Sequence, residues 1–202
     1  MKSILKTSAA VAALLVVSAT EAGAVCVITG TSGDDTLTAS AGLPPCDTTL
    51  IGLAGDDTLI GKAGDDRLWP GTQSTLHSGH DTMTGGAGND IFFFEDTPAA
   101  LGADAQEVTD FTHGVDTLDP GPICHAHSVT CTFIGAAPFS GTAGEIRYIV
   151  AGAGTYGIMS IDLDGDATSD FDAKLDGAPT VDSGDISYAI PPARKHNKTN
   201  AQ

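Results

Sequence analysis

The sequence predicts an all-β fold in which short strands and glycine-rich turns stack into a solenoid. Three observations predict it. A nine-residue phrase recurs five times within residues 30–93, its fourth and sixth positions are always Gly and Asp, and its eighth is always apolar. The pattern Gly-x-Asp-x-apolar is expected about once by chance in this composition, so five copies in one register indicate a repeat architecture.

Residues 1–24 are predicted to be a secretory signal peptide. Lys2 and Lys6 give a basic start, residues 9–19 form a short apolar run, and residues 22–24 are small enough for a cleavage site. The apolar run is too short to span a bilayer. We therefore expect a mature chain that begins near Val25 and is exported to the periplasm or the extracellular medium.

The composition is strongly acidic, with a formal net charge of -17. Such a surface excludes nucleic acid and anionic membranes as partners. The acidic residues are 22 Asp and only 4 Glu. Asp suits turns because its short side chain bonds to the nearby backbone. Few aromatic residues and a high charge disfavour folding unless something neutralises the carboxylates.

The four cysteines of an exported chain suggest two disulfides, with three possible pairings. The local choices join Cys26 to Cys46 and Cys124 to Cys131. Free or metal-bound thiols are the alternative.

Each repeat divides into a six-residue turn and a three-residue strand. Gly at the first and fourth positions permits positive φ, and the last three positions hold mostly residues that suit strands. The eighth positions are predicted to stack into a narrow core, with two repeats to a coil: Leu37, Leu59, Leu68, Met83 and Phe92.

The phrase is similar to the glycine-rich nonapeptide of RTX proteins, whose parallel β-roll holds Ca²⁺ between turns stacked on one edge. The resemblance implies that sixth-position carboxylates and turn glycines form the metal sites. These residues are Asp35, Asp57, Asp66, Asp81, Asp90, Gly30, Gly33, Gly52, Gly55, Gly61, Gly64, Gly85 and Gly88. Without an ion, two carboxylates stacked about 5 Å apart would repel by roughly 3 kcal/mol. Ca²⁺ is therefore expected to be part of the fold.

The register predicts which carboxylates share an ion. Residues 43–51 fit as a degenerate repeat with Leu50 in the core and Thr48 in place of Asp. One edge then carries Asp35, Asp57 and Asp81, and the other carries Thr48, Asp66 and Asp90. We expect ions between 35 and 57, between 57 and 81, and between 66 and 90. An Asp-rich solenoid without metal is the alternative.

After Phe94 the period ends. Alternation predicts strands near 132–134, 146–150, 158–163 and 171–175, joined by hairpins, and no stretch shows a helical period. This part resembles the C-terminal region of serralysins through Asp110-Phe111, Gly114-Val-Asp116-Thr-Leu-Asp119 and Asp162-Leu-Asp-Gly-Asp. The resemblance implies a β-sandwich-like cap on the roll. The predicted organisation is 1–24 signal peptide, 25–94 calcium-binding β-roll, 95–190 cap and 191–202 disordered tail.

The carboxylates of Asp162, Asp164, Asp166 and Asp170 alternate like an oxygen-ligand loop, although the spacing is not that of an EF-hand. A second kind of Ca²⁺ site and a solvated acidic hairpin both fit this loop.

The 202 residues contain no HExxH, so the zinc protease activity of the resembled family is not carried over. The predicted function is that of an exported, non-catalytic Ca²⁺-binding module that folds when the ion binds. The alternative is an extracellular adhesin or binding subunit that recognises a polysaccharide or a partner protein.

Overall fold

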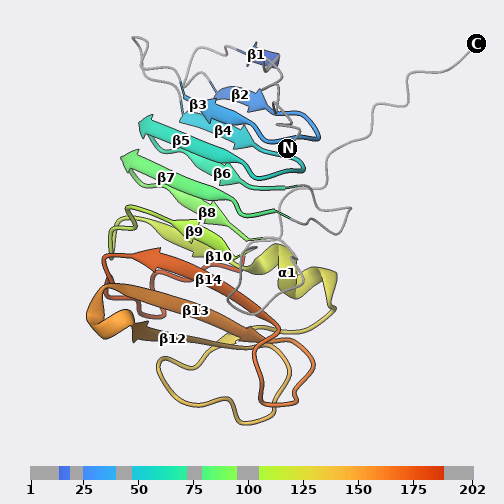
Figure 1. Cartoon of the computed structure of the whole chain (residues 1–202), viewed down its shortest axis with the longest axis vertical. Helices are drawn as coiled ribbons and strands as arrows, with labels where there is room; N and C mark the ends of the chain where they lie inside the picture. Colours follow the sequence, from blue (N-terminus) through green and yellow to red (C-terminus); the bar gives the residue numbers. More distant parts are fainter. Residues whose placement is uncertain (1–13, 19–24, 40–46, 72–78, 95–104, 189–202) are drawn as a thin grey trace, which may run out of the picture.

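The computed structural model describes residues 14–18, 25–39, 47–71, 79–94 and 105–188. Its strands form two sheets and lie one after another along the long axis of the molecule (Figure 1). In spatial order, the six-stranded sheet contains β1 (Leu14–Ser18), β2 (Val25–Thr29), β4 (Asp47–Ile51), β6 (Arg67–Trp69), β8 (Ile91–Phe93) and β10 (Thr117–Asp119). The eight-stranded sheet contains β11 (Thr132–Phe133), β12 (Glu145–Ala151), β13 (Tyr156–Asp162), β14 (Phe171–Asp176), β9 (Gln106–Val108), β7 (Thr82–Ala87), β5 (Thr58–Ala63) and β3 (Thr36–Thr38).

Successive strands of the repeats alternate between the two sheets. Strands β2, β4, β6, β8 and β10 pair in parallel on one side, and β3, β5, β7 and β9 pair in parallel on the other. Each coil therefore contributes one strand to each wall. The predicted all-β, parallel β-roll is confirmed.

The apolar eighth positions form the core of the roll. Leu50, Leu68 and Phe92 are in register on one wall, and Leu37, Leu59 and Met83 are in register on the other. All six are buried. Burying one large apolar side chain contributes about 1.5–3 kcal/mol, so these two rows supply much of the energy that holds the coils together.

Glycine is needed at the fourth position in two consecutive turns of the roll. Gly55 and Gly64 occupy equivalent places in consecutive repeats and both have φ of +116°. An L residue with a side chain rarely adopts this conformation, which explains why glycine stands at these two positions.

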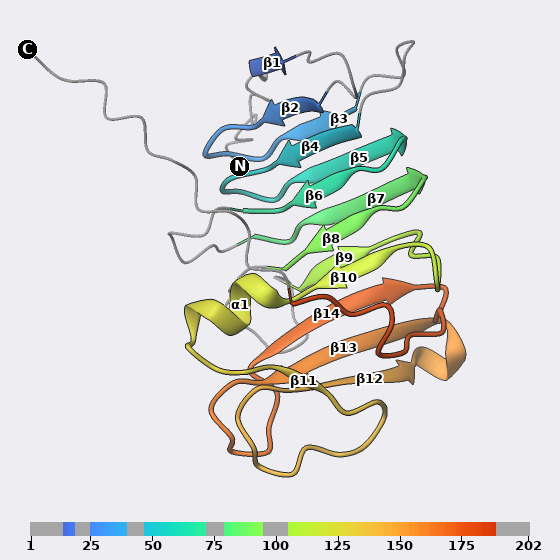
Figure 2. The same cartoon turned by 180° about the vertical axis from the view of Figure 1, so that it is seen from behind.

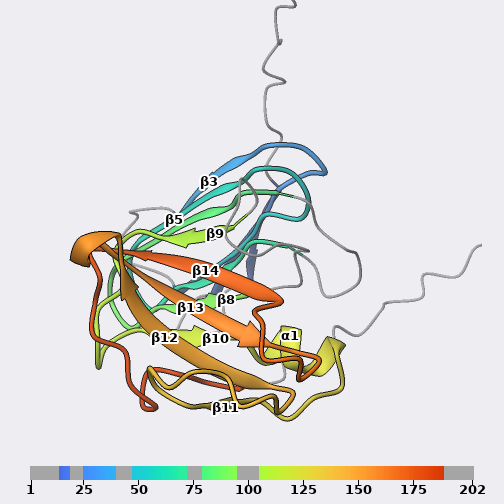
Figure 3. The same ribbon diagram turned by 60° about the horizontal axis from the view of Figure 1, so that its bottom comes forward.

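The C-terminal segment continues the eight-stranded sheet and closes the end of the roll. Strand β14 pairs in parallel with β9, whereas β14, β13 and β12 pair antiparallel. Figure 3 brings this end of the molecule forward. Phe171, Met159 and Ile146 are buried there, so the two hairpins of β12, β13 and β14 provide the cap. The prediction of a hairpin before β12 was wrong, because β11 pairs with β12 in parallel. The nine-residue period ends at Phe94, but β9 and β10 add one further parallel coil beyond it.

The α-helix α1 (Gly121–Ala126) was not expected from the sequence; it lies beside the roll next to β10 (Figure 2). A single 3-10 turn, η1 (Gly152–Gly154), lies between β12 and β13. With six residues α1 is too short for an apolar period to appear, although Pro122 favours a first helical turn. A disulfide joins Cys124 to Cys131, with 5.9 Å between the Cα atoms. Cys26 is buried, and Cys46 lies outside the described residues.

Most of the predicted signal peptide and the whole of the predicted tail at 191–202 lie outside the described residues. Within 1–24 only β1 is described, and it pairs antiparallel with β2. Among the described residues, no helix has the length and apolar character needed to cross a membrane.

Candidate metal sites

A row of buried aspartates follows each edge of the roll. On one edge the backbone N–H of Asp35 donates to Oδ1 of Asp57, at 2.8 Å, and the N–H of Asp57 donates to Oδ1 of Asp81, at 2.9 Å. On the other edge the N–H of Asp66 donates to Oδ1 of Asp90, at 2.9 Å. The structure thus brings together the three pairs of carboxylates that the register placed side by side.

The second row is longer than the sequence suggested. The N–H of Thr48 donates to Oδ1 of Asp66, and the N–H of Asp90 donates to Oδ1 of Asp116, at 3.0 Å. Asp116 is buried and was not predicted as a site residue. The signal was present, because Gly114-Val-Asp116-Thr-Leu118 is a sixth copy of Gly-x-Asp-x-apolar.

Asp110 was also missed by the sequence analysis. Its two carboxylate oxygens accept hydrogen bonds from the N–H groups of Gly85 and Gly86, at 2.9 and 2.8 Å. It therefore binds the last coil of the roll to the turn before it. No repeat position marks this residue, so only the three-dimensional structure could identify it.

In three of these aspartates the second carboxylate oxygen has no donor among the described residues. Oδ2 of Asp57, Asp66 and Asp90 is buried and lacks a hydrogen-bond partner within the part of the chain that the structure describes. Burying a charge without a partner is costly. Burial accordingly raises the pKa of each of these three carboxyl groups to about 6, and it raises the pKa of Asp81 to about 7.

The first-position glycines open space beside these oxygens. A Cβ placed on Gly61 would lie 2.4 Å from the carbonyl oxygen of Gly85 and 2.6 Å from Oδ2 of Asp66. A Cβ on Gly30 would lie 2.5 Å from the carbonyl oxygen of Gly52. A carbonyl from one coil and a carboxylate from the neighbouring coil therefore converge on one small space.

The first-position glycines Gly52 and Gly85 also lie beside a carboxylate oxygen, and the fourth-position glycines have other roles. A Cβ on Gly52 or Gly85 would also meet the aspartate of its own turn, whereas one on Gly33 would meet nothing within 4 Å. Gly55 and Gly88 pack against the turn of the preceding coil, and Gly64 provides a carbonyl oxygen beside Gly88.

The residues present fit a hard divalent cation. The unpartnered atoms are carboxylate oxygens, and the adjacent glycine turns add carbonyl oxygens. Ca²⁺ prefers these ligands, taking about six to eight oxygens in flexible geometry. A bound cation would also provide the missing partner for the buried oxygens of Asp57, Asp66 and Asp90.

The first row ends in an amide instead of a carboxylate. Strand β9 pairs with β7 so that Glu107 is in register with Thr82. Gln106, the residue before Glu107, therefore occupies the place in its coil that Asp81 occupies before Thr82. Gln106 is buried, and its Oε1 lacks a hydrogen-bond partner among the described residues. The two edges therefore terminate differently, in a neutral amide and in Asp116.

The acidic loop after β13 folds around its own backbone. Ligand atoms of Asp162, Asp164 and Asp166 lie within 4.8 Å of one another. Asp162 accepts from the N–H groups of Gly165 and Ala167, and Asp170 instead accepts from Leu163 and Asp164. A calcium site in this loop stays a prediction.

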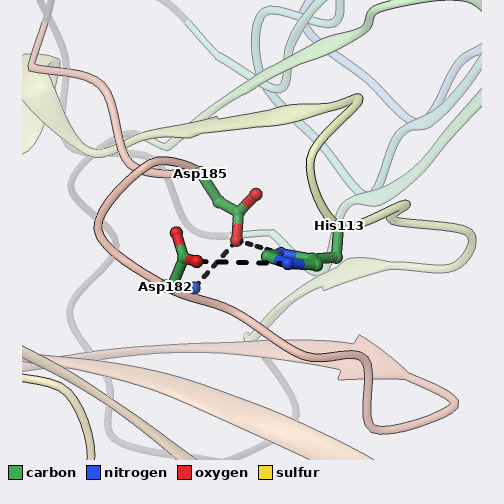
Figure 4. A group of neighbouring side chains, drawn as sticks. All are labelled: His113, Asp182 and Asp185. Atoms are coloured by element: carbon green, nitrogen blue, oxygen red, sulfur yellow. Dashed lines mark hydrogen bonds and ion pairs between the residues drawn. The ribbon is translucent and has the colours of Figure 1, made fainter.

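A separate cluster lies where the last coil meets the C-terminal segment (Figure 4). His113 Nδ1 is 2.7 Å from Oδ2 of the buried Asp185, and His113 Nε2 is 4.0 Å from Oδ2 of Asp182. The hydrogen bond to Asp185, and then its charge, raise the pKa of His113. Burial alone would raise the pKa of Asp185, but the N–H groups of Asp182 and Gly114, together with His113, hold it below its ordinary value.

Comparison with known proteins agrees with this architecture. The family model described as peptidase M10 serralysin C terminal matches residues 17–187. The solution structure of the AlgE6R2 subunit of the Azotobacter vinelandii mannuronan C5-epimerase has 27% identity and a TM-score of 0.54, over 81% of this chain and 93% of that one. The AlgE6R3 subunit of that enzyme has 24% identity and a TM-score of 0.55, over 84% and 86%. Among curated proteins no sequence match was found.

Proposed function

This chain belongs to the peptidase M10 serralysin C-terminal family, and on that premise we propose that it is an exported, non-catalytic module that binds Ca²⁺ between the stacked turns of its roll. The match is to the C-terminal part of the peptidase family, and the 202 residues contain no HExxH. The proposed ligands are Asp35, Asp57, Asp81, Asp66, Asp90 and Asp116, with carbonyl oxygens of the glycine turns.

One observation carries the proposal most directly. Asp57, Asp66 and Asp90 each bury one carboxylate oxygen for which no protein donor exists in the described residues. Each of these oxygens lies beside a first-position glycine, at Gly52, Gly61 and Gly85. Three repetitions of the same unsatisfied geometry are better explained by a repeated ligand than by three separate packing defects.

Calcium is proposed to act on folding and not on a substrate. Bound between two coils, the cation would offset the repulsion between stacked carboxylates and replace the water that each lost on burial. Binding and folding would then be coupled, so that the chain is unfolded or loose at low calcium.

Circular dichroism with and without EGTA tests the proposal. We expect the strand signal to require Ca²⁺. In isothermal titration, the Asp66→Ala and Asp90→Ala variants should release less heat of Ca²⁺ binding than the wild type. An equal strand signal in EGTA and in Ca²⁺ would remove the metal from the fold.

A second candidate is a binding subunit for an extracellular polysaccharide. It is favoured by the 27% identity to a subunit of an enzyme named for mannuronan. Titration of the calcium-loaded chain with mannuronan tests this function, with a neutral polysaccharide of similar length as the control. Absence of binding to mannuronan would rule out this second function and leave calcium binding as the proposed function.

A further inference from the structure

We propose that His113 and Asp182 form a second kind of metal site, for a transition-metal ion such as Zn²⁺, with Asp185 positioning the histidine. The site is chemically distinct from the oxygen-lined turns of the roll because it offers an imidazole nitrogen. Imidazole suits Zn²⁺, Cu²⁺ and Ni²⁺, whereas Ca²⁺ takes oxygen ligands.

Asp185 orients the ring. Its side chain is only 2% exposed and accepts hydrogen bonds from the N–H groups of Gly114, at 2.9 Å, and Asp182, at 2.8 Å. A carboxylate that already accepts two N–H groups acts as an acceptor toward Nδ1 of His113 as well. Nδ1 therefore carries the hydrogen, and in the neutral ring Nε2 keeps its lone pair.

This arrangement matches the outer shell of many metal sites. A ligating histidine commonly donates its other ring N–H to a carboxylate, which determines the tautomer and the ring orientation. Here Asp185 supplies that carboxylate, which is held by the N–H of Gly114, next to His113, and by the N–H of Asp182. The side chain of His113 is 43% exposed, so an ion can reach it from solvent.

Asp182 supplies the second ligand. Its Oδ2 lies 4.0 Å from Nε2 of His113, and its side chain is 62% exposed. Its other oxygen accepts from the N–H of Gly184, at 2.7 Å, which leaves Oδ2 facing the ring. Tetrahedral Zn²⁺ with ligand distances of about 2.1 Å needs a nitrogen–oxygen separation of about 3.4 Å, which a small movement of this exposed carboxylate provides. Water would complete the coordination.

The position of the site gives it a structural role. His113 lies in the turn before β10, and Asp182 and Asp185 lie after β14, where Ile186 forms a parallel bridge with Leu118 of β10. An ion held by His113 and Asp182 would join the last coil of the roll to the segment that covers it. It would therefore stabilise the cap independently of the calcium sites.

The test is calorimetric titration of the full chain with Zn²⁺ alone, at mildly alkaline pH, because protons compete for Nε2. Saturating Ca²⁺ is present throughout so that the roll is filled. We expect one Zn²⁺ per chain, lost in His113→Gln and in Asp182→Asn and retained in His125→Gln, a histidine of α1 outside the cluster. Asp185→Asn should weaken binding by about 10- to 100-fold.

The imidazole signals of His113 in an NMR spectrum provide a second readout and should shift at one equivalent of Zn²⁺. Circular dichroism in Ca²⁺ checks the folding of each variant, and the exposed Asp182 carries the test if His113→Gln does not fold. Wild-type binding in folded His113→Gln or Asp182→Asn, or no binding to the wild-type chain, would overturn the site. Undiminished affinity in Asp185→Asn would overturn the positioning role.

Discussion

The backbone N–H of Asp66 donates a hydrogen bond to Oδ1 of Asp90, 24 residues later in the chain, while the other carboxylate oxygen of Asp90 is buried without a partner. One oxygen of the side chain thus sets the register between coils, and the other is available to a cation. Asp57 and Asp66 serve the same two purposes in their own coils.

Removing one such charge should affect thermal stability in opposite directions with and without calcium. In Asp66→Asn the amide can still accept from Thr48, but it places an uncharged group beside Gly61. If the ion is present at about 100 times its Kd, losing it costs about 2.7 kcal/mol. We expect Asp66→Asn to lower thermal stability in Ca²⁺ and to maintain or raise it in EGTA, measured by calorimetry.

Asp65→Asn is the matched control, because Asp65 is the exposed neighbour and accepts from the N–H of Asn89. It should leave the calcium-dependent gain in stability unchanged. Equal losses in the two variants would mean that general charge, and not the buried oxygen, is responsible.

Filling the space beside a carboxylate should block the ion. The Cβ of Gly61→Ala would lie 2.4 Å from the Gly85 carbonyl oxygen and 2.6 Å from Asp66 Oδ2, closer than atoms can approach. Such overpacking typically costs about 1–3 kcal/mol. We expect Gly61→Ala to weaken calcium binding by isothermal titration, and Gly33→Ala, where the new atom has open space, to behave as wild type. Unchanged binding in Gly61→Ala would show that this space is not used.

The calcium-free chain should become more stable as the pH falls. Burial raises the pKa of Asp57, Asp66 and Asp90 from 3.8 to about 6, and that of Asp81 to about 7. Between about pH 4 and 7 the folded chain holds protons that the unfolded chain has released, so stability falls as the pH rises through this window.

Saturating calcium should reverse that slope, because the ion favours the deprotonated carboxylates and protons compete with it. Urea unfolding in EGTA and in Ca²⁺ at a series of pH values measures both slopes. If stability depends on pH in the same way in EGTA and in Ca²⁺, these four carboxyl groups do not bind calcium.

The single tryptophan should report on the assembly of the roll. Trp69 stacks on Phe93 of the next coil, with 3.8 Å between ring centroids and 13° between planes. We expect its emission to shift to longer wavelength in EGTA as the coils separate. In Phe93→Leu the emission in Ca²⁺ should change while the circular dichroism remains that of the wild type. An emission spectrum indifferent to calcium would show that these two coils stay stacked without it.

The repeat allowed the roll to be predicted closely, because period and register together determine which residues stack. The core positions Leu59, Leu68 and Phe92 followed from the nine-residue spacing. Beyond Phe94 the nine-residue spacing ends, so the phrase Gly114-Val-Asp116-Thr-Leu118 could indicate a further turn but not its register with Asp90. His113 and Asp185 are 72 residues apart in segments without a repeat, so only tertiary structure brings them together.

In the buried rows every N–H donor precedes its carboxylate acceptor along the chain, by 22 residues at Asp35 and by 26 at Asp90. A polypeptide that emerges amino end first, from a ribosome or through a translocation pore, therefore presents each donor before the matching acceptor. None of these hydrogen bonds can form until the later coil has emerged. We expect a chain that is still in transit to remain extended, and to wind up only after its carboxyl half has arrived.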